Sequence, residues 1–176
     1  MQILLDDEAI FIMTVFRRDV LDSVGGFDED LQTNEDYDLW IRAARAGFRF
    51  RRNPRPLGWY RRRGGSLSAN DVRMLTGIVR VYRKALADAK PGSPIESVIE
   101  QQIVRFDAER LAAEARLAIE SGDAAAAAGF VDALKARRGG WSLRALSLAL
   151  HHVPRAALWA WRARRQLQLE AGSYRA

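Results

Sequence analysis

The sequence predicts an α+β fold dominated by helices, in which a mixed N-terminal part precedes a helical extension. Short apolar runs rich in branched and aromatic residues, which are typical of strands, occur before residue 70. Beyond that point apolar residues recur at helical spacing, and Lys90-Pro91-Gly92-Ser93-Pro94 reads as a linker. We therefore expect two domains, residues 1–90 and residues 91–176.

The first expected element is a buried strand from Ile10 to Phe16, although at this length a helix start has the same apolar pattern. Asp19 is expected to cap a short helical turn over Val20 to Val24. The pair Gly25-Gly26 then makes a tight turn.

An amphipathic helix follows, with Thr33 as the predicted N-cap and Asp36 completing something close to a capping box. Apolar residues recur on one face at i, i+3, i+4 and i+7: Tyr37, Trp40, Ile41 and Ala44. Gly47 is the expected C′ residue that ends this helix.

The remaining elements are read in the same way. The alternation in Phe48 to Arg51 and the run from Leu57 to Tyr60 predict two further short strands, and a basic loop, Arg61 to Ser68, follows. Helices are expected over residues 71–89, 95–121, 124–137 and 141–168, the last interrupted at Pro154.

Composition limits the classes of function. The chain has no cysteine, which excludes disulfides and thiolate metal sites, and His151 and His152 point about 100° apart on a helix. The net charge of +6 fits anionic partners such as nucleotide diphosphates, phospholipid surfaces or nucleic acid. With neither a signal-peptide pattern nor a long apolar run, the chain reads as cytoplasmic.

The acidic start of the helix after Thr33 has two interpretations. Glu35 and Asp36 lie at the positive end of the helix dipole, which predicts an ionised Asp36 able to act as a general base. On spacing alone, the favoured interpretation is that both acids merely cap the helix. Trp40 is expected in the core, and Tyr37 stays open between core packing and stacking on a sugar.

Two basic regions likewise have two interpretations each. Arg61, Arg62 and Arg63, flanked by glycines, could clamp a diphosphate, but alone they read as a solvated loop. The C-terminal helix combines arginines with tryptophans, which suits either an anionic membrane surface or, slightly favoured, a bundle helix with a basic outer face: Arg144, Arg155, Arg162, Arg164 and Arg165 with Trp141, Trp159 and Trp161.

Taken in order, these segments resemble the C-terminal half of a family-2 glycosyltransferase, over residues 10–70. The resemblance rests on the ordered combination of Phe16-Arg17-Arg18, Val24-Gly25-Gly26-Phe27-Asp28-Glu29, Glu35-Asp36-Tyr37-Asp38-Leu39-Trp40-Ile41-Arg42, Gly47, Tyr60-Arg61 and Ser66-Leu67-Ser68. It implies part of a GT-A fold and inverting sugar transfer from a nucleotide-diphosphate donor.

The resemblance also implies residue roles. Asp36 becomes the expected catalytic base that deprotonates the acceptor hydroxyl, with Glu35 shaping the acceptor side. Gly25, Gly26 and Phe27 would lie where the donor sugar and acceptor meet, and Tyr37 joins this substrate-binding set. The loop of Arg61, Arg62 and Arg63 would close on the diphosphate, in place of the histidine that many relatives carry there.

In such enzymes an Asp-x-Asp motif in the first half of the fold holds Mg²⁺ or Mn²⁺, and this sequence lacks that half. We therefore expect a partial transferase acting on a saccharide or lipid-linked acceptor in polysaccharide or glycolipid biosynthesis, with peripheral membrane contact through the basic C-terminal helix. The alternative is a non-catalytic helical adaptor or remnant that binds a protein partner or an anionic membrane. Nucleic-acid binding, which rests on basicity alone, is not expected.

Overall fold

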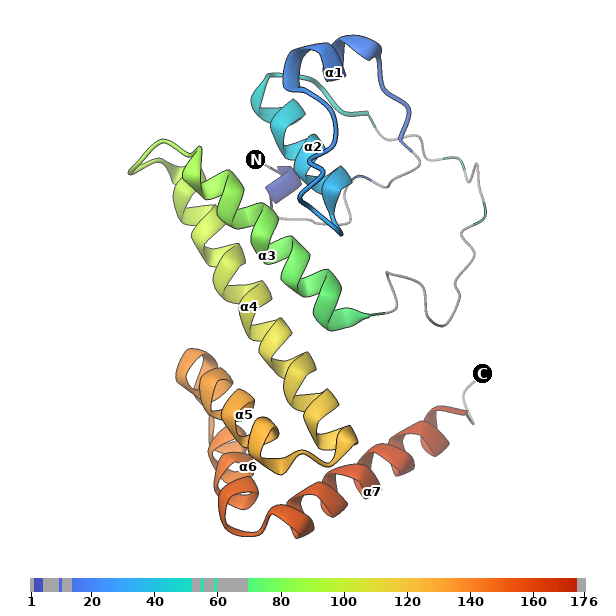
Figure 1. Cartoon of the computed structure of the whole chain (residues 1–176), viewed down its shortest axis with the longest axis vertical. Coiled ribbons are helices and arrows are strands. Elements are labelled where there is room, and N and C mark those ends of the chain that lie inside the picture. The colour runs from blue at the N-terminus through green and yellow to red at the C-terminus, as the bar shows by residue number, and fades with distance from the viewer. Residues whose placement is uncertain are drawn as a thin grey trace. The chain divides into compact units, whose positions relative to one another are not determined.

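The described part of the chain is built from seven α-helices and one short 3₁₀ helix (Figure 1). The computed structural model describes residues 2–4, 10, 14–51, 55, 59 and 70–173, with side chains up to residue 164. The elements are η1 Gln2–Leu4, α1 Arg18–Val24, α2 Glu35–Arg45, α3 Asp71–Ala87, α4 Pro94–Ser121, α5 Ala124–Arg138, α6 Trp141–His152 and α7 Pro154–Ser173. Two compact units, unit 1 (Met1–Asp107) and unit 2 (Ala108–Ala176), are described separately below.

Every helix that periodicity predicts is present, with small shifts at the ends. The breaks fall where glycine and proline predict them: Gly122 and Gly139 have φ values of 88° and 65°, and α7 begins at Pro154. The predicted cap at Asp19 is wrong. Helix α1 begins one residue before Asp19, no side chain caps it, and the Asp19 carboxylate lies 2.9 Å from the Arg17 guanidinium instead.

The predicted strands are not found in the described residues. Residues 14–17 and 48–51 have no regular secondary structure, and no strand in the described ranges is available to pair with them. A strand needs a partner for its backbone hydrogen bonds, so an apolar pattern alone does not produce one. Phe16 and Phe50 pack edge-on against Trp40 instead, at ring distances of 5.2 Å and 6.3 Å. Residues 11–13 of the first predicted strand, most of the third, Leu57 to Tyr60, and the loop Arg61 to Ser68 lie outside the described residues.

The helix-dominated part of the predicted fold class is therefore confirmed. Its relation to a GT-A fold and the division into domains 1–90 and 91–176 stay predictions.

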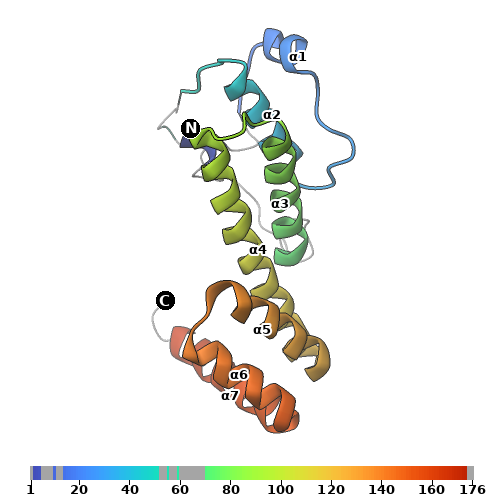
Figure 2. The ribbon, with the colours of Figure 1, turned by 90° about the vertical axis from the view of Figure 1, so that its left-hand side faces the viewer.

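The core of unit 1 forms between α2, α3, η1 and the first part of α4. Figures 1 and 2 both show α3 beside α4, and the Tyr82 and Phe106 rings stack there at 5.6 Å. Buried hydroxyls tie η1 to this core: Tyr37 donates to the Ile3 carbonyl at 2.6 Å and Tyr82 to the Leu4 carbonyl at 2.9 Å. A buried hydroxyl needs such a partner, so these hydrogen bonds hold both tyrosine side chains in place against η1.

Unit 2 packs α5, α6 and α7 around a second core made of alanines and branched residues, including Ala127, Val131 and Leu150. A polar cluster, which we call the Asp132 clamp, joins α5 to α6. The Asp132 carboxylate accepts hydrogen bonds from Lys135 at 2.7 Å and Ser147 at 2.6 Å, and lies 2.8 Å from His151 Nε2. Hydrogen bonds from Lys135, Ser147 and His151 hold the pKa of Asp132 well below its ordinary value.

No helix in the described ranges is both long and apolar enough to cross a bilayer.

Candidate functional site

The turn that begins α2 is fixed from outside by α3. Asn34 is the N-cap, in the left-handed conformation with φ 60°, and its side-chain amide donates to the Met74 carbonyl at 3.0 Å. Gly77 of α3 permits this approach, because a Cβ there would lie 2.1 Å from Thr33 Oγ1. The predicted Thr33 cap is therefore wrong: Thr33 is buried against α3, and no side chain caps α2.

Asp36 lies in the first turn of α2 and is half-buried. Its Oδ1 accepts the Tyr37 backbone N–H at 2.8 Å. Burial raises the pKa of the Asp36 carboxyl, the Tyr37 N–H lowers it, and the charge of Glu35 raises it further, so the net direction is upward. The sequence argument from the helix dipole predicted the opposite direction, because it took no account of burial. A raised pKa makes Asp36 a stronger base than an exposed aspartate.

The glycine pair lies against the other end of α2. Gly25, with φ 79°, ends α1, and the Arg42 guanidinium donates to the carbonyls of Val24 and, at 2.8 Å, Gly26. Arg42 is six residues after Asp36, which corresponds to about 9 Å along a helix axis. The structure thus holds the glycine pair beside the second half of α2 and Asp36 at its first turn.

A buried ion network, here called the Asp38 network, holds Arg42 in place. Asp38, whose side chain is 5% exposed, accepts a hydrogen bond from Arg42 Nε at 2.8 Å and lies 2.9 Å from Lys84 Nζ. Lys84 also lies 2.6 Å from the Asp28 carboxylate, in the loop after the glycine pair. Burial lowers the pKa of Lys84, but hydrogen bonds to Asp28 and Asp38 outweigh it and leave the pKa raised. The network joins the glycine loop, α2 and α3.

The other predicted site residues are placed as follows. Glu35 is half-buried beside Asp36, and Phe27 is 47% exposed. Tyr37 is 5% exposed with its hydroxyl used in the core, a position that favours the packing interpretation. Arg61, Arg62 and Arg63 lie outside the described residues.

Helix α2 ends in a Schellman motif, as Gly47 predicts. Gly47 has φ 89°, its N–H donates to the Ala44 carbonyl, and the Phe48 N–H donates to the Ala43 carbonyl, both at 3.1 Å. This turn directs Phe48 and Phe50 back along the apolar side of α2.

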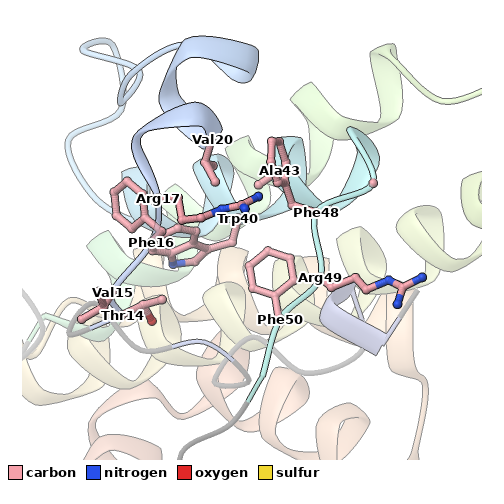
Figure 3. A pocket seen from close by; sticks show the side chains of 11 residues that line it. Thr14, Val15, Phe16, Arg17, Val20, Trp40, Ala43, Phe48, Arg49 and Phe50 are labelled. Carbon is pink, nitrogen blue, oxygen red and sulfur yellow. The ribbon is translucent and has the colours of Figure 1, made fainter.

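A pocket of about 440 Å³ lies on that side (Figure 3). We call it the aromatic pocket; Phe16, Trp40, Phe48 and Phe50 line it together with Arg17 and Arg49. Figure 3 shows Phe16 and Phe50 on two sides of Trp40, with the Arg49 guanidinium directed away from the rings. The buried Trp40 Nε1 finds no acceptor in the described part of the chain. The lining suits an apolar or aromatic group, and it includes neither Asp36 nor the glycine pair.

The described residues do not fit a divalent cation. Within them, no group of three or more histidine, cysteine, aspartate or glutamate side chains is placed to hold one.

Sequence reasoning missed the Asp38 network. The spacing of Asp38 and Arg42 at i, i+4 is a signal that could have identified that pair. Nothing in the sequence connects either residue to Lys84, which comes from a different helix.

Comparison with known protein families finds a match in the N-terminal half of the chain. Residues 12–87 match the family model described as "Glycosyl transferase family group 2", a range that extends beyond the expected residues 10–70 and ends with α3. No curated protein and no solved structure matches the chain. The matched range contains Asp36, the glycine pair, the Asp38 network and the aromatic pocket. The match therefore supports a family-2 glycosyltransferase-like domain over residues 12–87.

Proposed function

We propose that this chain supplies the acceptor-activating part of a glycosyltransferase that uses a nucleotide-diphosphate sugar, with Asp36 as the catalytic base. The observation that carries the proposal is a half-buried carboxylate with a raised pKa, at a helix start inside the segment that matches the transferase family. Perturbed carboxyl groups of this kind concentrate at functional sites.

The proposed step is a single displacement with inversion. An Asp36 carboxylate oxygen takes the proton of the acceptor hydroxyl, and the resulting oxygen nucleophile forms a bond to the anomeric carbon of the donor sugar. The bond from that carbon to the diphosphate breaks, and the nucleotide diphosphate leaves with the electron pair. Cationic groups stabilise that leaving group, a role that we assign to Arg61, Arg62 and Arg63.

The neighbouring residues have supporting roles in this proposal. Glu35 shapes the acceptor side and also raises the pKa of Asp36. Gly25, Gly26 and Phe27 form the loop near the reacting groups, and the Arg42 guanidinium fixes the backbone carbonyl of Gly26. The acceptor is a saccharide or lipid-linked molecule, as in polysaccharide or glycolipid synthesis, and the protein works at the cytoplasmic face of a membrane.

The test is Asp36→Asn in the full-length protein. Loss of a general base typically costs about 10²–10⁴-fold in rate, so we expect transfer to fall by that range while donor binding, measured by titration calorimetry with several nucleotide-diphosphate sugars, stays unchanged. Asp22→Asn is the matched control, because Asp22 is an exposed aspartate of α1 in the same segment. Full transfer activity in Asp36→Asn would overturn the assignment.

The second candidate is a helical adaptor that binds a partner or a membrane without catalysis. The observation that favours it is the separate helical unit 2, which lies outside the family match. This candidate predicts no heat of binding with any nucleotide-diphosphate sugar, whereas the transferase proposal requires binding by the full-length protein.

A further inference from the structure

Two segments of this protein carry basic residues without acidic ones: residues 39–70, with nine arginines, and a segment in the C-terminal part. Between Asp132 and Glu170 the chain has eight basic residues and no acidic one: Lys135, Arg137, Arg138, Arg144, Arg155, Arg162, Arg164 and Arg165. The rest of the chain therefore carries 20 basic and 22 acidic residues, a slight negative excess. This segment forms the last part of α5 and nearly all of α6 and α7, and unit 2 as a whole has 11 basic and 6 acidic residues.

Helix α6 exposes large apolar side chains on the side opposite to its packed face. Trp141 is 83% exposed and Leu148 60% exposed, and their separation of seven residues, with exposed Ala145 between them, places them on one stripe. Ser147 and Leu150 face α5 and are buried. The exposed stripe therefore has no role in the core of unit 2.

Helix α7 has the same arrangement. Leu158 and Trp161 pack against the unit 2 core, whereas Trp159 is 73% exposed and stands beside the exposed Ala156 and Ala160. Arg155 and Arg164, both exposed, lie at the two flanks of this alanine and tryptophan face at helical spacing. Val153, in the turn between α6 and α7, is 54% exposed.

We propose that the outward faces of α6 and α7 bind the surface of an anionic lipid bilayer. We call these faces the lipid-facing surface: Trp141, Ala145, Leu148, Val153, Ala156, Trp159 and Ala160, with Arg144, Arg155 and Arg164 at its edges. The proposal deepens the membrane-peripheral part of the proposed function and does not depend on the transferase part.

The chemistry of the surface selects this partner. Tryptophan favours the boundary between headgroups and acyl chains, where its ring is apolar and its N–H can find an acceptor. Arginines at the edge of an apolar face attract anionic headgroups, and the absence of acidic residues removes repulsion. Leu148, Val153 and Trp159 are each more than half exposed, so their apolar surface is available to the acyl-chain boundary of a bilayer.

Arg162 does not belong to the lipid-facing surface and has a structural role. Its guanidinium donates to the carbonyls of Ile119 at 3.0 Å and Glu120 at 2.8 Å, at the end of α4. It therefore holds α7 against α4 within unit 2, and it is not a residue to change in a binding test.

The test is sedimentation of the full chain with vesicles of phosphatidylcholine alone and of phosphatidylcholine mixed with phosphatidylglycerol. We expect binding to the mixed vesicles that weakens as salt is raised, and little binding to phosphatidylcholine alone. Arg155→Gln and Arg164→Gln should each weaken binding about fivefold, and Trp159→Ser should lower binding and reduce the blue shift of tryptophan fluorescence. Arg18→Gln and Arg83→Gln, made together, are the control for a variant with both Arg155→Gln and Arg164→Gln, since both control arginines are exposed in unit 1 and each pair removes two charges.

Three results would overturn the proposal: equal binding to both kinds of vesicle, equal weakening by the control pair, and binding of soluble polyglutamate without binding of vesicles. The last result would assign the surface to an acidic polypeptide. Asp36→Asn should bind vesicles normally, so that loss of transfer and loss of lipid binding can be told apart.

Discussion

Asp36 and Asp38 are two residues apart on α2 and have opposite electrostatic surroundings. Asp38 is buried, but Arg42 and Lys84 compensate its charge at 2.8 Å and 2.9 Å. Asp36 is half-buried, and burial raises its pKa more than the Tyr37 N–H lowers it. Asp38 is thus a structural acid, and Asp36 is the acid with a chemically useful proton affinity.

This contrast predicts substitutions of opposite effect on the free energy of unfolding. Asp38→Asn leaves Arg42 and Lys84 without their shared counter-charge, and we expect a loss of about 3 kcal/mol. Because the pKa of Asp36 in the folded protein is raised above 3.8, its contribution to stability is full below pH 3.8 and is lost as the pH rises through the folded pKa. Asp36→Asn should therefore stabilise the protein at neutral pH and change little in acid.

Urea denaturation of Asp38→Asn and Asp36→Asn, at neutral pH and below pH 3.8, measures these changes in the free energy of unfolding. Asp22→Asn removes only an exposed, distant partner of Arg18 and should stay within about 0.5 kcal/mol of the unaltered protein. A loss of stability in Asp36→Asn at neutral pH would show that its carboxylate is structural.

At the scale of elements, the sequence identifies the helices because their signals are local. The face of Tyr37, Trp40 and Ile41 and the C′ glycine Gly47 depend only on residues within the same helix, and all are found as predicted. Two kinds of feature are predicted wrongly from the sequence. The strand-like segments around Phe16 and Phe50 depend on partner strands, and the start of α2 depends on α3, which no pattern near Thr33 reveals.

In the candidate site, too, the sequence predicts the local features and misses those that depend on distant segments. The resemblance selects Asp36 and the glycine pair, but the separation between them and the ion network that fixes the loop come from contacts with Arg42 and Lys84. Such contacts join segments far apart in the chain, so they follow from the fold and not from local spacing. The raised pKa of Asp36 likewise depends on burial by the folded chain.

The contact between α3 and the start of α2 predicts an unusual response to glycine replacement. Alanine normally stabilises a helix interior by about 1 kcal/mol relative to glycine. In Gly77→Ala the new Cβ would lie 2.1 Å from Thr33 Oγ1 and 2.6 Å from Asn34 Nδ2, and we expect a net loss of about 1–3 kcal/mol. Gly129→Ala in α5 is the matched control, because a Cβ there meets no atom within 4 Å, and it should stabilise.

Thermal and urea denaturation of both glycine variants give the comparison. If Gly77→Ala stabilises the protein as much as Gly129→Ala does, the close contact of Thr33 with α3 is refuted.

At the scale of the whole molecule, the family match and the net charge are distributed unequally between the two units. The family match ends with α3, inside unit 1, which has 17 basic and 16 acidic residues, whereas unit 2 has 11 basic and 6 acidic residues. Each unit has its own core, around Trp40, Val81 and Tyr82 in the first and around Ile119, Val131 and Leu150 in the second. Most of the net positive charge therefore lies in a different unit from the candidate base Asp36, whereas the arginines of residues 39–70 lie in the same unit as Asp36.

Separate cores predict that damage to one unit stays in that unit. Val131→Ala in α5 and Val81→Ala in α3 form a matched pair, since each valine is 1% exposed, and each change should cost about 2 kcal/mol in its own core. Because regions with separate cores open as separate cooperative units, Val131→Ala should speed amide hydrogen exchange in α5 and α6 and leave α2 and α3 unchanged. Val81→Ala should do the reverse, as measured by hydrogen exchange with mass spectrometry. An equal loss of protection in both units from either change would mean that the chain unfolds as one cooperative body.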